Sequence, residues 1–194
     1  MTTLFAFRRP MRRTLLVAAL MPVLIAALMG GWAGLLQLNG NIHTVEPGVL
    51  YRSAQLDGPA LEALIRRDRI ATVLNLRGAA PGSLWYEREV AATAAAGAGH
   101  LDLGLSANRQ PDGNTLAQLI EILRTAPKPL LIHCNSGADR SGLAAALFEL
   151  LDAHKSPREA AEQLSFRYGH FPWLTSRTGA MDATYWTVAQ GAAR

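Results

Sequence analysis

Short runs of apolar, β-branched residues alternate with helical patterns along the chain from about residue 50 onward. The runs "IATVLNLRG" and "KPLLIH" predict buried strands, whereas "TLAQLIEILRTAP" and "GLAAALFELLDAH" have the spacing of helices. Strands that are separated by helical crossovers normally pair in parallel, and their helices cover the faces of the sheet. The sequence therefore predicts an α/β fold with a central, mostly parallel sheet flanked by helices.

Other segments fit the same alternation. The stretch around "EPG" predicts a link and one short strand with "EPG" as the turn, and "HLDLGLS" predicts a further strand. "WYEREVAATAAAGAG" predicts a helix that ends on its glycines. We expect Asn114 or Thr115 to cap the helix over "TLAQLIEILRTAP". A later helix is expected to start at Ser156, with Pro157 at its first position.

An uncharged and mostly apolar run covers residues 15–38. Its 24 residues exceed the roughly 20 that a membrane-spanning helix needs. We therefore expect a transmembrane helix over residues 15–38, between a basic N-terminus at residues 1–14 and a folded domain over residues 41–194. A cleaved signal peptide is the alternative, although its apolar region normally has only about 7–15 residues before a small-residue cleavage site. A buried helix of a soluble protein is the third option, and the flanking arginines disfavour it.

Four arginines, Arg8, Arg9, Arg12 and Arg13, precede the apolar run, and no acidic residue occurs before Glu46. Positive residues beside a membrane helix stay in the cytoplasm. We therefore expect a single-pass membrane protein with its folded domain on the exported, extracytoplasmic side. The same arginines account for the net charge of +4, because subtracting them from the 19 basic residues leaves 15 against 15 acidic ones. No basic surface for a nucleic acid is predicted.

The cysteine and histidine content argues against a metal enzyme. A single cysteine excludes an internal disulfide framework and a cysteine-based zinc site within one chain. The five histidines show no metal-ligand spacing such as H-E-x-x-H. We therefore expect no metal and no other cofactor.

The single cysteine, Cys134, lies in "LLIHCNSGADRSGLAAALFEL", between a predicted buried strand and a predicted helix. Ligands of open α/β sheets bind at such junctions. Gly137 permits an unusual backbone angle, so the loop amides can turn inward as an anion cradle. The helix N-terminus adds roughly half a positive charge, which favours a thiolate. Arg140 offers a planar fork for two phosphate oxygens, and Ser141 can donate a hydrogen bond to the sulfur. This combination suits phosphoryl transfer to sulfur, followed by hydrolysis.

The segment "HCNSGADRS" matches the H-C-x5-R-[S/T] signature of the cysteine-dependent protein tyrosine and dual-specificity phosphatases. "GVLYRSAQL" and "TVLNLRG" resemble the small bacterial or atypical dual-specificity branch, and the resemblance covers roughly residues 41–175. It implies that Cys134 forms a phosphocysteine intermediate, that Arg140 holds the phosphate and that Ser141 assists hydrolysis. The phosphate-binding loop that it implies consists of Asn135, Ser136, Gly137, Ala138, Asp139 and Arg140.

These phosphatases usually need a carboxylic acid that protonates the leaving oxygen. Aligning the helix with the family places Ala107 or Asn108 where an aspartate is expected. Asp112 lies later in the same loop and is our candidate acid, although "PDGN" is also a good turn sequence. Asp102 and Asp139 are the other candidates. Asp139 would oppose a bound phosphate dianion, so it would alternatively position water or orient Arg140.

Other residues leave alternatives open. His133 is expected to orient the loop from beneath rather than to touch substrate. Arg52 and Arg77 follow strands and either face the pocket or form structural salt bridges. Arg167 and His170 either reach the substrate or belong to a segment that packs a C-terminal helix against the sheet.

The leading hypothesis is a membrane-anchored phosphatase that acts on phosphotyrosine and also on phosphoserine or phosphothreonine of proteins. The first alternative is an inositol phosphate or phospholipid phosphatase, which the absence of lysine from "NSGAD" disfavours. The second alternative is a catalytically weak phosphate-binding module, suggested by the uncertain acid. A rhodanese-type sulfur-transfer protein also has a cysteine loop, but the Arg-Ser pair and the helix that follows fit phosphate better.

Overall fold

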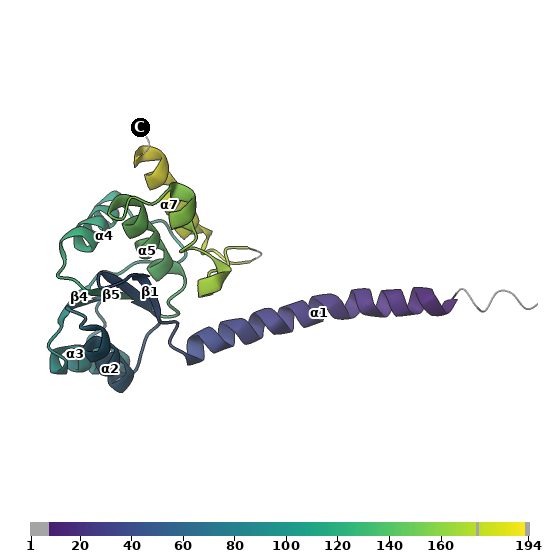
Figure 1. The fold of residues 1–194 in the computed structure, drawn as a ribbon, viewed down its shortest axis with the longest axis horizontal. Helices are drawn as coiled ribbons and strands as arrows, with labels where there is room; N and C mark the ends of the chain where they lie inside the picture. The colour runs from purple at the N-terminus through teal and green to yellow at the C-terminus, as the bar shows by residue number, and fades with distance from the viewer. Residues whose placement is uncertain (1–7, 174, 193–194) are drawn as a thin grey trace, which may run out of the picture. The chain divides into compact units, whose positions relative to one another are not determined.

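The computed structural model of the chain describes residues 8–173 and 175–192. The chain divides into two compact units, Met1–Leu38 and Asn39–Arg194 (Figure 1). Residues 1–7 of the predicted basic N-terminus and residues 193–194 of the predicted domain lie outside the described residues.

The first unit contains one long helix, α1 (Arg8–Leu38). Within it, Ala18–Leu38 form a stretch of 21 residues with a mean hydropathy of 1.9. At about 1.5 Å per residue, such a stretch spans roughly 30 Å, the thickness of the hydrocarbon core of a bilayer. The helix is therefore long and apolar enough to cross a membrane, and the crossing itself remains a prediction.

The second unit is built on a five-stranded sheet with the strand order β1-β2-β5-β3-β4. The strands are β1 (His43–Glu46), β2 (Leu50–Ser53), β3 (Thr72–Asn75), β4 (Gly99–Asp102) and β5 (Leu130–His133). β1 pairs antiparallel with β2, and the other three pairs are parallel. The predicted α/β fold with a mostly parallel sheet is confirmed. The prediction of one strand around "EPG" was incomplete, because strands on both sides of this turn form a hairpin.

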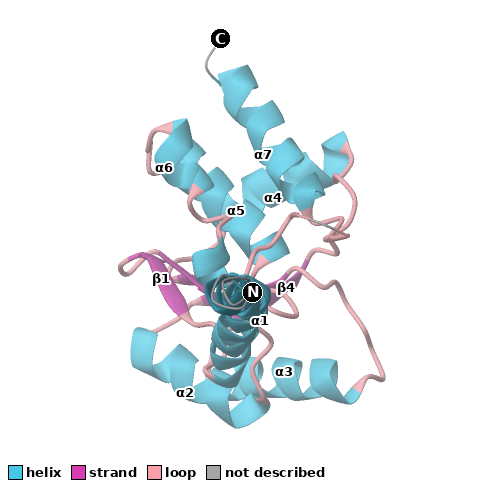
Figure 2. Cartoon of the chain, turned by 90° about the vertical axis from the view of Figure 1, so that its right-hand side faces the viewer, coloured by secondary structure: helices cyan, strands magenta, loops and turns pink. Residues whose placement is uncertain are grey.

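Helices cover both faces of the sheet, as Figure 2 shows. α2 (Gly58–Asp68) and α3 (Leu84–Ala95) lie on one face. α4 (Gly113–Thr125), α5 (Asp139–Leu151), α6 (Pro157–Ala161), the 3-10 helix η1 (Phe166–Tyr168) and α7 (Gly179–Ala192) belong to the other side. Successive strand residues point to opposite faces, which splits the core into two clusters. Val73 and Leu131 pack with α2, whereas Leu74 and Ile132 pack with α5.

Two helix starts refine the sequence-based expectations. Ser156 caps α6 in a reciprocal capping box with Glu159, and Pro157 occupies the first turn, as predicted. The helix is short, however, because a 3-10 turn replaces its continuation. The N-cap of α4 is Asp112, and the prediction of Asn114 or Thr115 was wrong. The carboxylate of Asp112 precedes the first turn and can accept a hydrogen bond from a free backbone N–H of that turn. The side chains of Asn114 and Thr115 lie inside the turn and cannot cap it in this way.

Candidate active site

Cys134 is the first residue after β5, at the carboxyl edge of the sheet. Its side chain is buried, with 1% exposed, and five residues later the chain is already in the first turn of α5. The backbone N–H of Leu76, after β3, donates to the carbonyl of His133 at 2.9 Å. The ends of neighbouring strands therefore fix the chain up to the residue before the thiol.

Arg52, the third residue of β2, supports the loop after Cys134 from behind. Its side chain is fully buried, and its Nη2 donates to the carbonyl oxygens of Gly137 at 2.8 Å and Ala138 at 3.0 Å. Its Nη1 donates to the backbone and side-chain oxygens of Gln163, and the guanidinium lies 4.2 Å from the Tyr168 ring centroid. Burial lowers the pKa of Arg52 to about 10, so the guanidinium stays charged near neutrality. Arg52 thus holds the loop and does not line its open side.

Asn41 and Gln55 hold the first half of the loop in the same way. The Nδ2 of Asn41 donates to the carbonyls of Ser136 and Tyr168, both at 2.9 Å. The backbone N–H of Gln55 donates to the carbonyl of Asn135 at 3.1 Å. In a trans peptide the carbonyl and the next N–H point in opposite directions. Carbonyls drawn outward therefore direct the following amides toward the inside of the loop, as an anion nest requires.

Gly137 has the positive φ that the sequence suggested, at +71°. A Cβ at this position would lie 2.6 Å from the backbone nitrogen of Ala54 and 2.7 Å from the carbonyl carbon of Ser53. Both the backbone conformation and the close approach to β2 therefore require glycine here.

Arg140 and Ser141 carry buried donors at the start of α5. The Nη1 of Arg140 lies 3.4 Å from the carbonyl oxygen of Leu76 and 3.3 Å from that of Leu105. Within residues 8–173 and 175–192, five buried side-chain polar atoms have no hydrogen-bond partner, and three belong to the cysteine motif: Arg140 Nε, Ser141 Oγ and His133 Nδ1. Buried donors normally have acceptors. Arg140 Nε and Ser141 Oγ, both at the start of α5, are therefore the donors for which a ligand beside Cys134 would supply acceptors.

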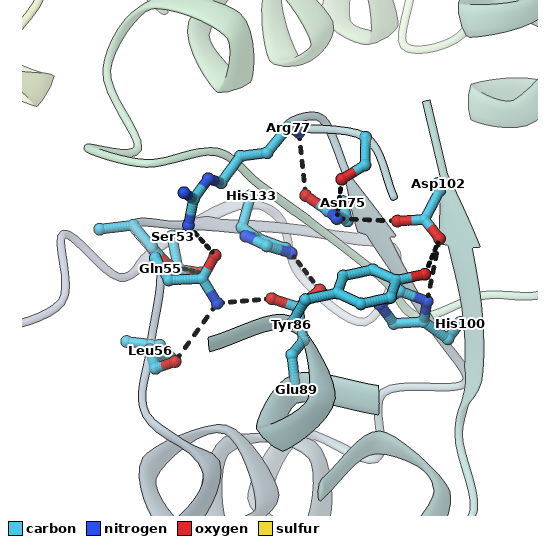
Figure 3. Close-up of polar contacts among 12 residues, drawn as sticks. Ser53, Gln55, Leu56, Asn75, Arg77, Tyr86, Glu89, His100, Asp102 and His133 are labelled. Carbon is cyan, nitrogen blue, oxygen red and sulfur yellow. Dashed lines mark hydrogen bonds and ion pairs between the residues drawn. The ribbon is translucent and has the colours of Figure 1, made fainter. Parts of the chain in front are cut away.

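A buried carboxylate, Glu89 of α3, organises the floor of the site (Figure 3). Its Oε1 pairs with the Nε2 atoms of His100 at 2.8 Å and His133 at 3.1 Å, and its Oε2 accepts from Gln55 at 2.5 Å. Burial alone raises the pKa of Glu89, but the hydrogen bonds from His100, His133 and Gln55 outweigh it and lower the pKa to about 2. The ionised Glu89 thereby orients the His133 ring, and the expected role of His133 in orienting the loop stays a prediction.

Asp102, one of the candidate acids, belongs to the same network. It ends β4, where its Oδ1 accepts from Asn75 at 2.7 Å and its Oδ2 from the Tyr86 hydroxyl at 2.6 Å. The Nδ1 of His100 lies 3.7 Å from Oδ2. Figure 3 places these groups beside Glu89. Asp102 therefore has structural partners on the α3 side of the sheet.

Asp139, a second candidate acid, is paired with a buried histidine. The Nδ1 of His170 lies 2.7 Å from Asp139 Oδ1, and its Nε2 lies 2.8 Å from Asp182 Oδ2. Burial lowers the pKa of His170, but the bonds to these carboxylates outweigh it and raise the pKa to about 9. His170 is thus a charged link between the cysteine loop and α7, which favours the packing alternative for this segment.

Asp112, the third candidate, accepts from the backbone N–H and the hydroxyl of Thr115 at 2.9 and 2.8 Å. These bonds lower the pKa of Asp112 and so favour its carboxylate form. Asp112 also lines a cavity of about 300 Å³ together with Leu105 and Arg109. The cavity adjoins the site, because Leu105 accepts from Arg140. The catalytic role of Asp112 remains a prediction.

The sequence did not single out the residues that support the loop. Asn41, Gln55, Glu89 and Gln163 are polar, and they stood among many other polar residues. No local signal marked Glu89, because its burial on α3 follows from the packing of that helix against the sheet. In the described part of the chain, no group of three or more His, Cys, Asp or Glu side chains is arranged to hold a metal ion.

Comparisons with known proteins agree with this geometry. Residues 106–160, which contain the cysteine motif, match the family described as the tyrosine phosphatase family. The structure of TpbA from P. aeruginosa is similar, with 23% identity and a TM-score of 0.61 over 80% of this chain and 92% of TpbA. The core catalytic domain of the PP-IP phosphatase Siw14 from S. cerevisiae has 21% identity and a TM-score of 0.58, over 79% of this chain and 93% of that domain.

A third similar structure, PTPMT1, has 18% identity and a TM-score of 0.54, over 78% of this chain and 98% of its own. No curated protein matches the chain. The resemblance to the cysteine-dependent tyrosine and dual-specificity phosphatases, predicted from the cysteine motif, is confirmed by the match over residues 106–160.

Proposed function

We propose that the chain is a membrane-anchored phosphatase that hydrolyses phosphomonoesters through a phosphocysteine intermediate. One observation carries the proposal. The carbonyls of the loop from Asn135 to Ala138 are drawn outward by Asn41, Arg52 and Gln55, so the loop amides and Arg140 can face a phosphate next to Cys134. This arrangement is an electrostatic cradle for the charge that develops during phosphoryl transfer.

The proposed reaction has two steps. The thiolate of Cys134 attacks phosphorus, so an S–P bond forms while the bond from phosphorus to the leaving oxygen breaks. That oxygen departs as an alcohol or phenol after taking a proton from an acid or from water, with Asp112 as the candidate acid. Water then attacks phosphorus, the S–P bond breaks, and inorganic phosphate and the thiolate are released. Ser141 stabilises the departing sulfur, and Arg140 holds the phosphate oxygens throughout.

We place phosphotyrosine first among substrates, with phosphoserine and phosphothreonine of proteins next. A TpbA structure has been solved in complex with pTyr, which supports this class. Inositol phosphates and phospholipids are the alternative class, and the PP-IP phosphatase Siw14 supports it by its fold. Because the thiolate and Arg140 supply the nucleophile and the positive charge, the reaction needs no metal or other cofactor.

Helix α1 is proposed to be the single membrane anchor, with the phosphatase unit on the extracytoplasmic side. Its 21-residue apolar stretch supports spanning, and the arginines before it support this orientation. A C-terminal reporter that fluoresces only in the cytoplasm should stay dark. A bright reporter in the membrane fraction would refute the orientation.

The deciding experiment compares the full chain in detergent with its Cys134→Ser variant on p-nitrophenyl phosphate. We expect turnover by the wild type and a loss of roughly 10³-fold or more in the variant, because its nucleophile is removed. A wild type that binds phosphate without turnover would instead be a phosphate-binding module. A panel of phosphopeptides, inositol phosphates and phospholipids would then rank the substrate classes.

A further inference from the structure

Three neighbouring strands bring one further arginine to the cysteine loop. β2, β5 and β3 are paired so that their last residues stand side by side. Gln55, Asn135 and Arg77 each follow two residues beyond those ends, at the same edge of the sheet. The backbone N–H of Gln55 donates to the carbonyl of Asn135, and that of Leu76, the residue before Arg77, donates to the carbonyl of His133. Arg77 therefore begins beside the residue that follows Cys134.

The side chain of Arg77 is held from two sides. Its Nη1 donates to the Oε1 of Gln55 at 2.9 Å, and its guanidinium carbon lies 3.5 Å from the ring centroid of Trp85. Since β5 lies between β3 and β2, this reach from Arg77 to Gln55 crosses the end of β5. Figure 3 shows the side chain running toward Gln55 near His133. The guanidinium is therefore fixed across the strand that carries the cysteine.

The charges around Arg77 agree with this position. Burial, followed by the nearby Arg140 guanidinium, lowers the pKa of Arg77, while Glu89 and the sulfur of Cys134 act in the opposite direction. Arg77 thus lies close enough to Arg140 and Cys134 to interact electrostatically with both. Of its five N–H donors, the described part of the chain engages one, through Gln55. Two like charges at one site repel each other, and an anion bound between them relieves the repulsion.

We infer that Arg77 forms a second phosphate-binding position next to the cysteine loop, so that within each proposed substrate class, phosphopeptides as well as inositol phosphates, a compound with another phosphate close to the one transferred is preferred. The inference rests on the proposed function and adds the substrate chemistry. A planar guanidinium that is already immobilised loses little conformational freedom when it binds a phosphate in bidentate fashion. The competing explanation is that Arg77 only braces Gln55, and the test separates the two.

The test uses a matched pair of substrates, phenyl phosphate and 1,2-phenylene bisphosphate, which differ by the second phosphate. For the wild type we expect a kcat/KM at least roughly tenfold higher on the bisphosphate, the effect of one charge-assisted hydrogen bond. In Arg77→Gln this preference should fall about tenfold, and Arg77→Lys should lie between the two. Arg66→Gln is the control, because it removes an exposed arginine of α2 that pairs with Glu62, and it should keep the preference.

The outcomes separate this inference from the proposed function. No preference in the wild type, or an equal loss on both substrates in Arg77→Gln with an unchanged melting temperature, would overturn the second position. If the wild type turns over neither substrate, the phosphatase proposal fails. In that case, calorimetry on Cys134→Ser still tests the second position. It measures the affinities for phenyl phosphate and 1,2-phenylene bisphosphate, and the ratio of the two affinities is compared between Cys134→Ser and the double variant that also carries Arg77→Gln. A free inositol bisphosphate and vesicles with a phosphoinositide bisphosphate distinguish a soluble source from a lipid source.

Discussion

The Nη2 atom of Arg52 donates to the carbonyl oxygen of Gly137 at 2.8 Å, and the Arg52 side chain has no solvent exposure. A buried guanidinium therefore sets the peptide orientation of a loop that we propose presents its amides to an anion. The same group also contacts Ala138 and Gln163. Arg52 thus links β2, the cysteine loop and the segment after α6, and the shape of the site depends on a residue that does not line its open side.

Replacing Arg52 with lysine should damage both stability and activity. One ammonium group cannot reproduce the contacts of both guanidinium nitrogens to Gly137, Ala138 and Gln163. We expect a loss of roughly 2–3 kcal/mol in the free energy of unfolding and a fall in kcat/KM of about 10²-fold, because the loop amides are displaced. Denaturant unfolding and p-nitrophenyl phosphate kinetics measure the two effects. Wild-type kcat/KM in Arg52→Lys would contradict the supporting role.

Gly137→Ala should strongly reduce activity, because both the close approach to β2 and the positive φ require glycine. The new Cβ would meet the backbone nitrogen of Ala54 at 2.6 Å, at a φ of +71° that alanine rarely adopts. We expect kcat/KM to fall by about 10²-fold or more and the melting temperature to decrease. Gly113→Ala is the matched control, because a Cβ there meets nothing within 4 Å. If both variants behave alike, the close approach to β2 has no role in catalysis.

The fold was predictable because local pattern and tertiary structure agree. The apolar runs that became β3 and β5 are completely buried, so their sequences carry little else than strand-forming residues. β1 was missed because its sequence, HTVE, has a single apolar residue and therefore no apolar run that marks a strand, so its pairing with β2 defines it more than its own residues do. The end of α6 was not predictable either. Ser156 and Pro157 mark its start in the sequence, whereas tertiary contacts decide where it ends.

The candidate site was predictable only where its residues are contiguous. Cys134 to Ser141 form a continuous motif whose spacing carries the chemistry. Arg52, Glu89 and His170 reach this motif from 82, 45 and 36 residues away in sequence, the differences between residue numbers. Their contacts depend on strand order and helix packing, which no local pattern encodes. The sequence could therefore indicate the candidate nucleophile, but it left the roles of Arg52 and His170 open and did not indicate Glu89.

Asp112→Asn tests the candidate acid with little structural damage, because asparagine also caps helices well. We expect turnover of an aryl phosphate to stay within about threefold of the wild type, since a phenol leaving group needs little protonation. A loss of about 10²-fold confined to an alkyl phosphate would identify Asp112 as the acid. Equal rates of variant and wild type on both substrates would remove it from the mechanism. Asp112→Ala should cost roughly 1 kcal/mol of stability through the lost cap.

His170 should make the stability of the folded unit depend on alkaline pH. Its pKa is raised to about 9 by hydrogen bonds to Asp139 and Asp182, against the lowering effect of burial, whereas an unfolded histidine titrates near 6.5. A group with a raised folded pKa stabilises fully below its unfolded pKa and loses that contribution as pH rises through the folded value. With about 1.4 kcal/mol per unit, the loss between pH 6.5 and pH 10 is roughly 3 kcal/mol.

The measurement compares urea unfolding of the full chain in detergent for the wild type and His170→Gln between pH 6 and pH 10. Lysines and tyrosines also titrate at the alkaline end, so the difference between the two proteins is the relevant quantity. It should be largest at pH 6, shrink steadily from about pH 6.5 and level off above about pH 9. Asp182→Asn removes one of the two carboxylates that face the ring. In that background, the stability difference at pH 6 between the protein that keeps His170 and the one that also carries His170→Gln should be smaller, although not zero. Parallel stability curves for the wild type and His170→Gln would mean that the imidazole is neutral in the folded protein, and the charged link between the cysteine loop and α7 would not exist.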